Sequence, residues 1–325
     1  MTKRALLTGG TGFVGANLAR TLLHQGHEVY LLARPGYKPW RIAGILKDLH
    51  MIEVDLRNRD GLDQVVDKIL PEWVFHLASY GAYPFQTDSG LMVQTNLTGT
   101  INLVDVCLKT GFESFIYAGT SSEYGFKDHA PLETELVEPN SSYAVTKAAA
   151  THFCSYTARS TGMRLYTLRL YSVYGPFEEP SRLIPSLIIH GLEGRLPPLV
   201  TPHIGRDFVY VGDVCQAFLL VAAQPNQEAG AVYNVGSGIQ VTIEKAVEIA
   251  RRLMNIPTEP DWGSMQERSW DTSVWVSNPE KIYAKTGWTA GTSLEGGFQE
   301  TVSWFCQNPS YIDFYKKTNL NKSVG

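Results

Sequence analysis

The sequence contains little cysteine and no long apolar run. Its four cysteines are far apart and show no Cys-x-x-Cys or other zinc-ligand spacing, so we predict buried, reduced thiols and no metal site. No apolar run approaches the roughly 20 residues that a membrane span needs, and no signal peptide precedes the first predicted strand. We therefore expect no membrane partner and a cytoplasmic location. The cysteines are Cys107, Cys154, Cys215 and Cys306.

The chain also lacks an excess of either charge, a repeat and a low-complexity tract. Its formal net charge is -4 at pH 7, which provides no global positive field and argues against nucleic acid as a partner. A chain of 325 residues can bury a full core. These features predict one large α/β unit or two intimately joined lobes.

Glycine is concentrated near the N-terminus, where Thr8-Gly9-Gly10-Thr11-Gly12-Phe13-Val14-Gly15 follows a short apolar run. Glycines at this spacing let a strand turn sharply into a helix and bring backbone N–H groups against a pyrophosphate. Such turns also occur without a ligand, but the strand before it and the amphipathic segment after it favour a dinucleotide site. The candidate cofactor contacts here are Gly9, Thr11, Gly12, Phe13, Val14 and Gly15.

Strand and helix patterns alternate through the first half of the chain, which predicts a Rossmann-type, doubly wound parallel sheet. Residues 1–175 are predicted to form the dinucleotide-binding domain, and 176–325 mainly a smaller, interleaved substrate lobe, with returns to the large domain near 206–236. Strands are predicted over 5–7, 29–33, 51–54, 73–78, 115–118, 165–170 and 232–235, and helices over about 12–25, 60–69, 88–109 and 140–161.

Tyr143 and Lys147 are four residues apart, on one face of the last of these predicted helices. A nearby cation stabilises a phenolate, so Lys147 is expected to lower the pKa of Tyr143 and to make it a usable acid or base. Spacing of this kind is also common on helices without any catalytic role. The pair is more indicative of catalysis in this chain, because hydroxyl groups follow the predicted strand 115–118.

The segment Thr120-Ser121-Ser122-Glu123 places these hydroxyl groups at the carboxyl end of a sheet strand, where active sites of such folds lie. Thr120 could bind a substrate oxygen beside Tyr143, or could simply cap a turn. Further along, Glu133, Glu135 and Glu138 are predicted to lie in a solvated loop.

Arg34 ends the second predicted strand, about 20 residues after the glycine turn, where NAD enzymes usually carry an acidic residue for the ribose hydroxyl. An arginine there favours the 2′-phosphate of NADP. Alternatively, Arg34 is a solvated strand-end residue or stacks on adenine in an NAD site.

Nearly the whole chain resembles the extended short-chain dehydrogenase/reductases, in their nucleotide-sugar epimerase, dehydratase and reductase branch. The motifs are the glycine turn, Asp55-Leu56, His76-Leu77-Ala78-Ser79, Asn96, Thr120, Tyr143 with Lys147, Val173-Tyr174-Gly175-Pro176 and Arg206-Asp207-Phe208. The resemblance implies that Thr120, Tyr143 and Lys147 are catalytic. It also implies that Asp55 and Leu56 line the adenine pocket, that Leu77, Ala78 and Ser79 follow the cofactor, and that Lys147 holds the nicotinamide ribose.

Dehydratases of this branch carry an acid and a base directly after the catalytic threonine, whereas this chain has Ser121 and Ser122. Glu123 comes one residue late, and a shift of one residue points a side chain the other way. The chain is most similar to the 4-ketoreductases of the CDP-paratose and CDP-abequose synthase type. This similarity predicts NADPH-dependent reduction of a CDP-, dTDP- or GDP-linked 4-keto-6-deoxy sugar.

Two other functions stay open: an NAD-dependent nucleotide-sugar 4-epimerase and a non-catalytic dinucleotide sensor of the same fold. Arg206 and Arg268 are candidates for the substrate diphosphate, because guanidinium groups match phosphate oxygens, although either could form a surface ion pair. Tyr80, Ser121 and Ser122 are candidate substrate contacts. The resemblance further implies a homodimer formed through helices near 88–109 and 140–161.

Overall fold

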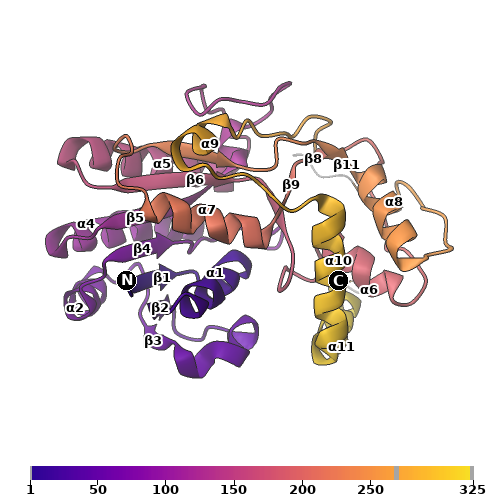
Figure 1. Cartoon of the computed structure of the whole chain (residues 1–325), viewed down its shortest axis with the longest axis horizontal. Helices are drawn as coiled ribbons and strands as arrows, with labels where there is room; N and C mark the ends of the chain where they lie inside the picture. The colour runs from indigo at the N-terminus through magenta and orange to yellow at the C-terminus, as the bar shows by residue number, and fades with distance from the viewer. Residues whose placement is uncertain (1, 267–270, 323–325) are drawn as a thin grey trace.

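Alternating buried strands and amphipathic helices produce a seven-stranded parallel sheet (Figure 1). The computed structural model describes residues 2–266 and 271–322. The strand order is β10-β6-β5-β4-β1-β2-β3. The strands are β1 (Arg4–Thr8), β2 (Glu28–Ala33), β3 (His50–Glu53), β4 (Trp73–His76), β5 (Ser114–Thr120), β6 (Leu165–Leu170) and β10 (Val232–Val235). All predicted strands are present, and the predicted doubly wound Rossmann-type sheet is confirmed.

Both faces of the sheet are covered, as a parallel sheet requires. Side chains alternate along β1, so Ala5 and Leu7 join one buried cluster while Leu6 joins the other. The helices α1 (Phe13–His24) and α7 (Val211–Ala223) pack on the first face. The second face is covered by α2 (Arg59–Ile69), α4 (Gly99–Thr110) and α5 (Ser142–Thr161).

The helix predicted over 88–109 is divided into three parts. A short α3 (Ser89–Met92) leads into a π-helical turn, η3 (Val93–Thr98), which continues into α4. Such a wide turn commonly occurs at functional sites. Here it buries Asn96, whose side chain accepts a hydrogen bond from Tyr80 N at 2.8 Å and donates one to Thr146 Oγ1 on α5 at 2.9 Å.

A second apolar core lies beyond the carboxyl ends of the strands. It is built by α6 (Leu183–Gly191), α8 (Ile243–Met254), α10 (Leu294–Gln307) and α11 (Pro309–Lys322), which gather on the right in Figure 1. Two small ribbons join this part to the sheet: β7 (Ser172–Tyr174) with β9 (Phe208–Tyr210), and β8 (Gly205–Arg206) with β11 (Val241–Thr242). The chain returns to the sheet through α7, β10 and α9 (Glu280–Thr286).

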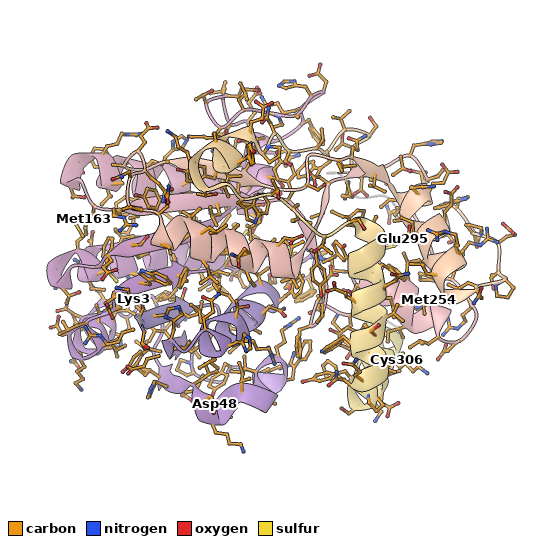
Figure 2. All side chains as sticks on the ribbon, in the orientation of Figure 1. Lys3, Asp48, Met163, Met254, Glu295 and Cys306 are labelled. Carbon is orange, nitrogen blue, oxygen red and sulfur yellow. The ribbon has the colours of Figure 1, made fainter. Side chains whose placement is uncertain are left out.

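The remaining short elements are η1 (Pro39–Arg41), η2 (Ala43–Asp48) and η4 (Ser121–Tyr124). Three cysteines are buried as predicted, but Cys306 is exposed on α10, because it faces away from the second core (Figure 2). Across residues 2–266 and 271–322, no helix combines the length and apolar character that a bilayer crossing requires.

Candidate active site

A cleft of about 1340 Å³ runs along the carboxyl edge of the sheet, between the sheet and the second core. Its volume exceeds the roughly 300–1,000 Å³ of a typical small-molecule pocket, so it can hold two ligands side by side. Arg268 lies outside the described residues. All other sequence-predicted site residues line this one cleft: Gly9, Thr11, Gly12, Phe13, Val14, Gly15, Arg34, Asp55, Leu56, Leu77, Ala78, Ser79, Tyr80, Thr120, Ser121, Ser122, Tyr143, Lys147 and Arg206.

The glycine turn leaves no room for side chains. A Cβ atom on Gly15 would lie 2.3 Å from Gly9 O, and Gly9 has a φ of +70° and faces the backbone of Leu77 and Ala78. Gly12 caps α1 without any side-chain hydrogen bond, so the first backbone N–H groups of this helix are not satisfied by a cap. Because these groups and the helix dipole attract anions, the turn fits the pyrophosphate of a dinucleotide.

Two arginines flank Asp55 at the far end of the cleft. Arg57 donates to both carboxylate oxygens of Asp55, at 3.0 and 2.7 Å. These bonds, with a smaller contribution from the Arg34 charge, lower the pKa of Asp55. Arg34 is exposed at the rim of the cleft. Arg57, which the sequence analysis did not single out, therefore fixes an ionised carboxylate where the adenine was expected.

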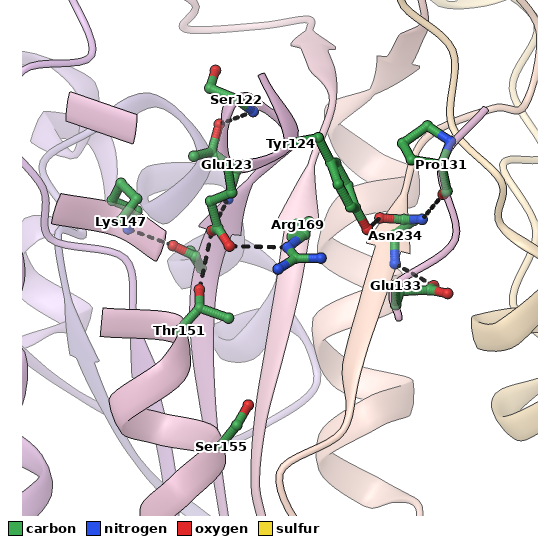
Figure 3. A network of polar contacts seen from close by, with 12 residues as sticks. Ser122, Glu123, Tyr124, Pro131, Glu133, Lys147, Thr151, Ser155, Arg169 and Asn234 are labelled. Atoms are coloured by element: carbon green, nitrogen blue, oxygen red, sulfur yellow. Dashed lines mark hydrogen bonds and ion pairs between the residues drawn. The ribbon is translucent and has the colours of Figure 1, made fainter. Parts of the chain in front are cut away.

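Thr120 ends β5 and caps the following turn, η4. Its Oγ1 accepts a hydrogen bond from Ser122 N at 3.2 Å, while Glu123 accepts one from Thr120 N at 3.0 Å (Figure 3). Thr120 therefore caps a turn, which was one of the two roles that the sequence allowed. Since its oxygen accepts this bond, its own proton stays available for a group in the cleft.

Glu123 is fully buried and points away from the cleft, as its position in the sequence predicts. It forms an ion pair with Arg169 on β6, with Nε 2.9 Å from Oε2, and accepts a hydrogen bond from Thr151 on α5 at 3.0 Å. Figure 3 shows this network to the right of Lys147. Glu123 thereby joins the end of β5 to the helix that carries Tyr143 and Lys147.

The same buried region corrects the prediction for Glu133. Its carboxylate accepts a hydrogen bond from Asn234 N at 2.9 Å, and Asn234 accepts one from Tyr124 OH at 2.8 Å (Figure 3). Burial raises the pKa of Glu133. The loop that holds Glu133 folds onto β10, so this carboxylate is half-buried and bonded rather than freely solvated. The sequence has no short-range pattern that signals this contact.

Lys147 is buried at the base of the cleft. Its Nζ donates to Ala118 O at 2.6 Å and lies 4.1 Å from the centre of the Tyr117 ring. Burial lowers the pKa of Lys147 to about 8, and the charge of Glu123 partly opposes this shift. The ammonium group is therefore held by a carbonyl, an aromatic face and a nearby buried carboxylate.

The pKa of Tyr143 differs from the one that the sequence predicted. Burial, followed by the charge of Glu123, raises its pKa to about 12, while Arg182 and a hydrogen bond with Ser79 partly oppose the rise. Lys147 was expected to lower this pKa, but its ammonium is engaged by Ala118 O and the Tyr117 ring. At neutral pH the phenol therefore keeps its proton, which suits a proton donor better than a base.

The second core contributes residues that the sequence analysis missed. Arg182, at the start of α6, donates to Ala82 O at 3.0 Å and lies 5.4 Å from the centre of the Tyr83 ring. Arg206 forms an ion pair with Asp271, and Arg182 acts on it through its like charge. Glu178 also lines the cleft and is buried. Arg206, on β8, was a sequence candidate, whereas Glu178 and Arg182 lie in the segment between β7 and α6, and only their charge could have marked them.

No group of three or more His, Cys, Asp or Glu side chains that could hold a metal ion occurs within the described ranges. The arrangement provides instead a proton donor, a hydroxyl group and a buried cation around one position, with arginines further along the cleft. It can polarise and protonate a carbonyl group of an anionic ligand.

Comparison with known proteins identifies a family and several similar enzymes named for reactions on nucleotide sugars. The family model described as NAD dependent epimerase/dehydratase family matches residues 5–236. A probable dTDP-glucose 4,6-dehydratase of Sinorhizobium fredii is 26% identical, with 94% of this chain and 93% of that protein covered. A GDP-6-deoxy-D-mannose reductase of Pseudomonas aeruginosa is 28% identical, with 93% and 97% covered. The structure of the Thermus thermophilus UDP-glucose 4-epimerase in complex with NAD matches with a TM-score of 0.82 and 29% identity, covering 94% of this chain and 99% of that one.

Proposed function

The chain belongs to the NAD-dependent epimerase/dehydratase family of nucleotide-sugar enzymes, and from that premise we propose that it reduces the C4 ketone of a nucleoside-diphosphate 4-keto-6-deoxy sugar. The observation that carries the proposal is the environment of Thr120. The two residues after it in the cleft are serines, and the next carboxylate, Glu123, is buried and paired with Arg169. Elimination of water needs a positioned proton-transfer group, which these serines do not supply.

Each catalytic side chain has a role that its environment supports. A bound reduced nicotinamide coenzyme supplies the hydride to the ketone carbon. Tyr143 gives its proton to the ketone oxygen, and the raised pKa keeps that proton in place until the carbonyl becomes basic. The Thr120 hydroxyl donates a hydrogen bond that orients the same oxygen. The buried Lys147 ammonium stabilises negative charge as it develops near Tyr143.

The two ends of the cleft select the two ligands. Gly9 to Gly15 and Asp55 bind the dinucleotide, and Arg34 favours NADPH by binding the 2′-phosphate. Arg206 and Arg182 bind the substrate diphosphate, and Tyr80 contacts the sugar. The similar GDP-6-deoxy-D-mannose reductase is a relative whose name describes reduction of a deoxy sugar.

Purified protein mixed with NADPH and CDP-, dTDP- or GDP-linked 4-keto-6-deoxy sugars tests the proposal. NADPH absorbance should fall with at least one ketone. Tyr143→Phe should slow the reaction by about a thousandfold, which is typical for loss of a general acid, while NADPH still binds. No oxidation with any of these ketones would contradict ketone reduction.

One alternative has support from the comparisons. The Thermus thermophilus UDP-glucose 4-epimerase is 29% identical over nearly the whole chain, and Thr120, Tyr143 and Lys147 would also serve its reversible oxidation of one carbon. Protein that purifies with NAD and interconverts two UDP-sugars would establish that function in place of reduction.

We also propose that the chain forms a homodimer through η3, α4 and α5. Large apolar side chains are exposed on η3 and α5, which flank α4 in this surface, at 45% for Val93 on η3 and at 51% for Val145 and 65% for Tyr156 on α5. Exposed apolar patches of this kind often mark interfaces. A monomeric mass in solution at micromolar concentration would contradict the dimer.

A further inference from the structure

The cleft contains one carboxyl group that the proposed reaction does not use. Glu178 lies between β7 and α6 and is 7% exposed. Glu178 N donates to Gly175 O at 3.2 Å, but Oε2 has no hydrogen-bond partner among the described residues. A buried polar atom without a partner destabilises the folded state. Native proteins retain few such atoms, so this one calls for a functional explanation.

The backbone before Glu178 is held in an unfavourable conformation. Phe177 has a φ of 69°, a left-handed value that is unfavourable for a residue other than glycine. Arg41 Nε donates to Phe177 O at 2.8 Å, and Asn17 donates to Pro176 O at 2.9 Å. The Phe177 ring lies against Trp304 and under the Arg20 guanidinium. These contacts keep Phe177 out of the cleft, while Glu178 lines it.

The neighbours of Glu178 indicate which part of the cleft it serves. Glu178 and Arg182 both act electrostatically on Tyr83, and Tyr83 and Arg182 both act on Tyr143. Arg182, four residues further along the same segment, lies 5.4 Å from the centre of the Tyr83 ring and donates to Ala82 O at 3.0 Å, so the segment that carries Glu178 packs against the loop of Tyr83. Arg34 and Asp55 lie at the opposite, adenosine end of the cleft.

The chemistry of the carboxyl group narrows the choice of ligand. Burial raises the pKa of Glu178 to about 8; Glu179 adds to this shift, and Arg182, Gly175 N–H and Arg41 oppose it. At neutral pH the group is mostly a neutral acid, which can donate and accept hydrogen bonds. A sugar hydroxyl offers the same pair of functions. A diphosphate does not, because its oxygens only accept hydrogen bonds and leave the acceptor oxygen of the carboxyl group without a donor.

We propose that Glu178 binds a hydroxyl group of the sugar ring and so selects the sugar part of the nucleotide-sugar ligand. The inference rests on the nucleotide-sugar substrate proposed above, but not on the direction of hydride transfer. The strained turn at Phe177 and the unpartnered Oε2 are then the cost of keeping this group ready for the ligand.

Binding titrations test the proposal without turnover. CDP-glucose, UDP-glucose, dTDP-glucose and GDP-mannose are compared with the corresponding nucleoside diphosphates, in the presence of NADPH. Glu178→Leu keeps the shape and removes the polar atoms; it should weaken the best sugar nucleotide about tenfold, as loss of one buried hydrogen bond does. The matching diphosphate should bind as before. Glu178→Gln should retain most of the sugar affinity, and Glu248→Gln, on the exposed face of α8 and outside the cleft, is the matched control.

Thermal unfolding separates binding from a structural role. Glu178→Leu removes the unpartnered oxygen, so its unfolding temperature should equal or exceed that of the wild type, whereas a structural carboxylate would make it fall. Three results would overturn the proposal: no sugar nucleotide binds more tightly than its diphosphate, Glu178→Leu weakens both equally, or it weakens NADPH instead. Absence of NADPH oxidation would contradict only the reductase function.

Discussion

The two ends of the cleft are built in different ways. At the dinucleotide end, strand ends and one helix N-terminus supply backbone groups, and the contacts come from short continuous segments such as Gly9–Gly15 and Leu77–Ser79. At the sugar end, Glu178 and Arg182 come from the segment between β7 and α6, Arg206 comes from β8, and Tyr83 comes from the segment after β4. Only packing between distant parts of the chain brings these three segments together.

This difference suggests that the dinucleotide end serves coenzyme binding and catalysis in general, whereas the sugar end determines which sugar is bound. The sheet edge fixes the reacting centre rigidly, because Thr120 ends β5 and α5, which carries Tyr143 and Lys147, is bonded to the end of that strand. The sugar end can change its side chains without disturbing the sheet. A substitution at the first end should therefore affect every ligand that uses the coenzyme, and one at the second end should affect particular sugars.

Gly15→Ala should produce the largest effect and tests the rigidity of the dinucleotide end. Its Cβ would lie 2.3 Å from Gly9 O, so the turn must open and the phosphate-binding N–H groups must move. We expect NADPH affinity to fall by more than about a hundredfold, since several charge-assisted hydrogen bonds are lost together. Coenzyme fluorescence measures the binding. Gly44→Ala, where no atom lies within 4 Å of the added carbon, is the control; a Gly15→Ala protein that binds normally would refute the rigid turn.

Glu123→Gln tests the buried ion pair and hydrogen bond that connect β5, β6 and α5 next to the reacting centre. It leaves Arg169 buried and without its counter-charge, which should lower the free energy of unfolding by about 3 kcal/mol. Glu123 raises the pKa values of both Tyr143 and Lys147, so its neutral replacement lowers both. A rate that needs a protonated Tyr143 and a charged Lys147 falls as pH rises through these values. The decline should therefore begin at lower pH in the variant.

Denaturant unfolding and pH–rate profiles measure these two effects. Thr151→Val, which removes only the hydrogen bond from Thr151 to Glu123, should cost about 1 kcal/mol and leave the profile in place. An unshifted profile in Glu123→Gln would show that this carboxylate is purely structural.

The fold was largely predictable because its signals are local. Buried strands of four to seven residues alternate with amphipathic helices, and the glycine turn, Thr120 and the Tyr143–Lys147 pair each lie in a continuous segment. The sequence predicted that Glu123 points away from the cleft, but it reaches this direction through the turn η4 and not through strand alternation.

The features that the sequence did not predict depend on packing between segments that are far apart in the chain. The π-helical turn at 93–98 has the same apolar pattern as an ordinary helix. Glu133 looked solvated because its partner Asn234 is about a hundred residues away in the sequence. The pKa of Tyr143 was predicted in the wrong direction, because the sequence shows the nearby lysine but neither the burial nor the carbonyl that engages it.

Arg182→Met tests the independence of the sugar end. The variant keeps the apolar stem that covers Tyr83 and removes the charge facing the cleft. The KM for the sugar nucleotide should rise about thirtyfold, as expected for loss of a charged hydrogen bond, while the affinity for NADPH stays within about twofold. Arg195→Met, on an exposed surface ion pair, is the matched control. Equal losses for both ligands would mean that the two ends are not independent.

Arg34→Ala should have the smallest effect. It tests whether the dinucleotide end recognises the 2′-phosphate separately from the adenine. If Arg34 binds the 2′-phosphate, the ratio of kcat/KM for NADPH to that for NADH should fall about tenfold, because only NADPH carries that group. Arg57→Ala removes the partner of Asp55 and should weaken both coenzymes alike, since adenine is common to them. An unchanged ratio in Arg34→Ala would favour stacking of Arg34 on adenine. The comparison of the two variants therefore separates recognition of the phosphate from recognition of the base within one end of the cleft.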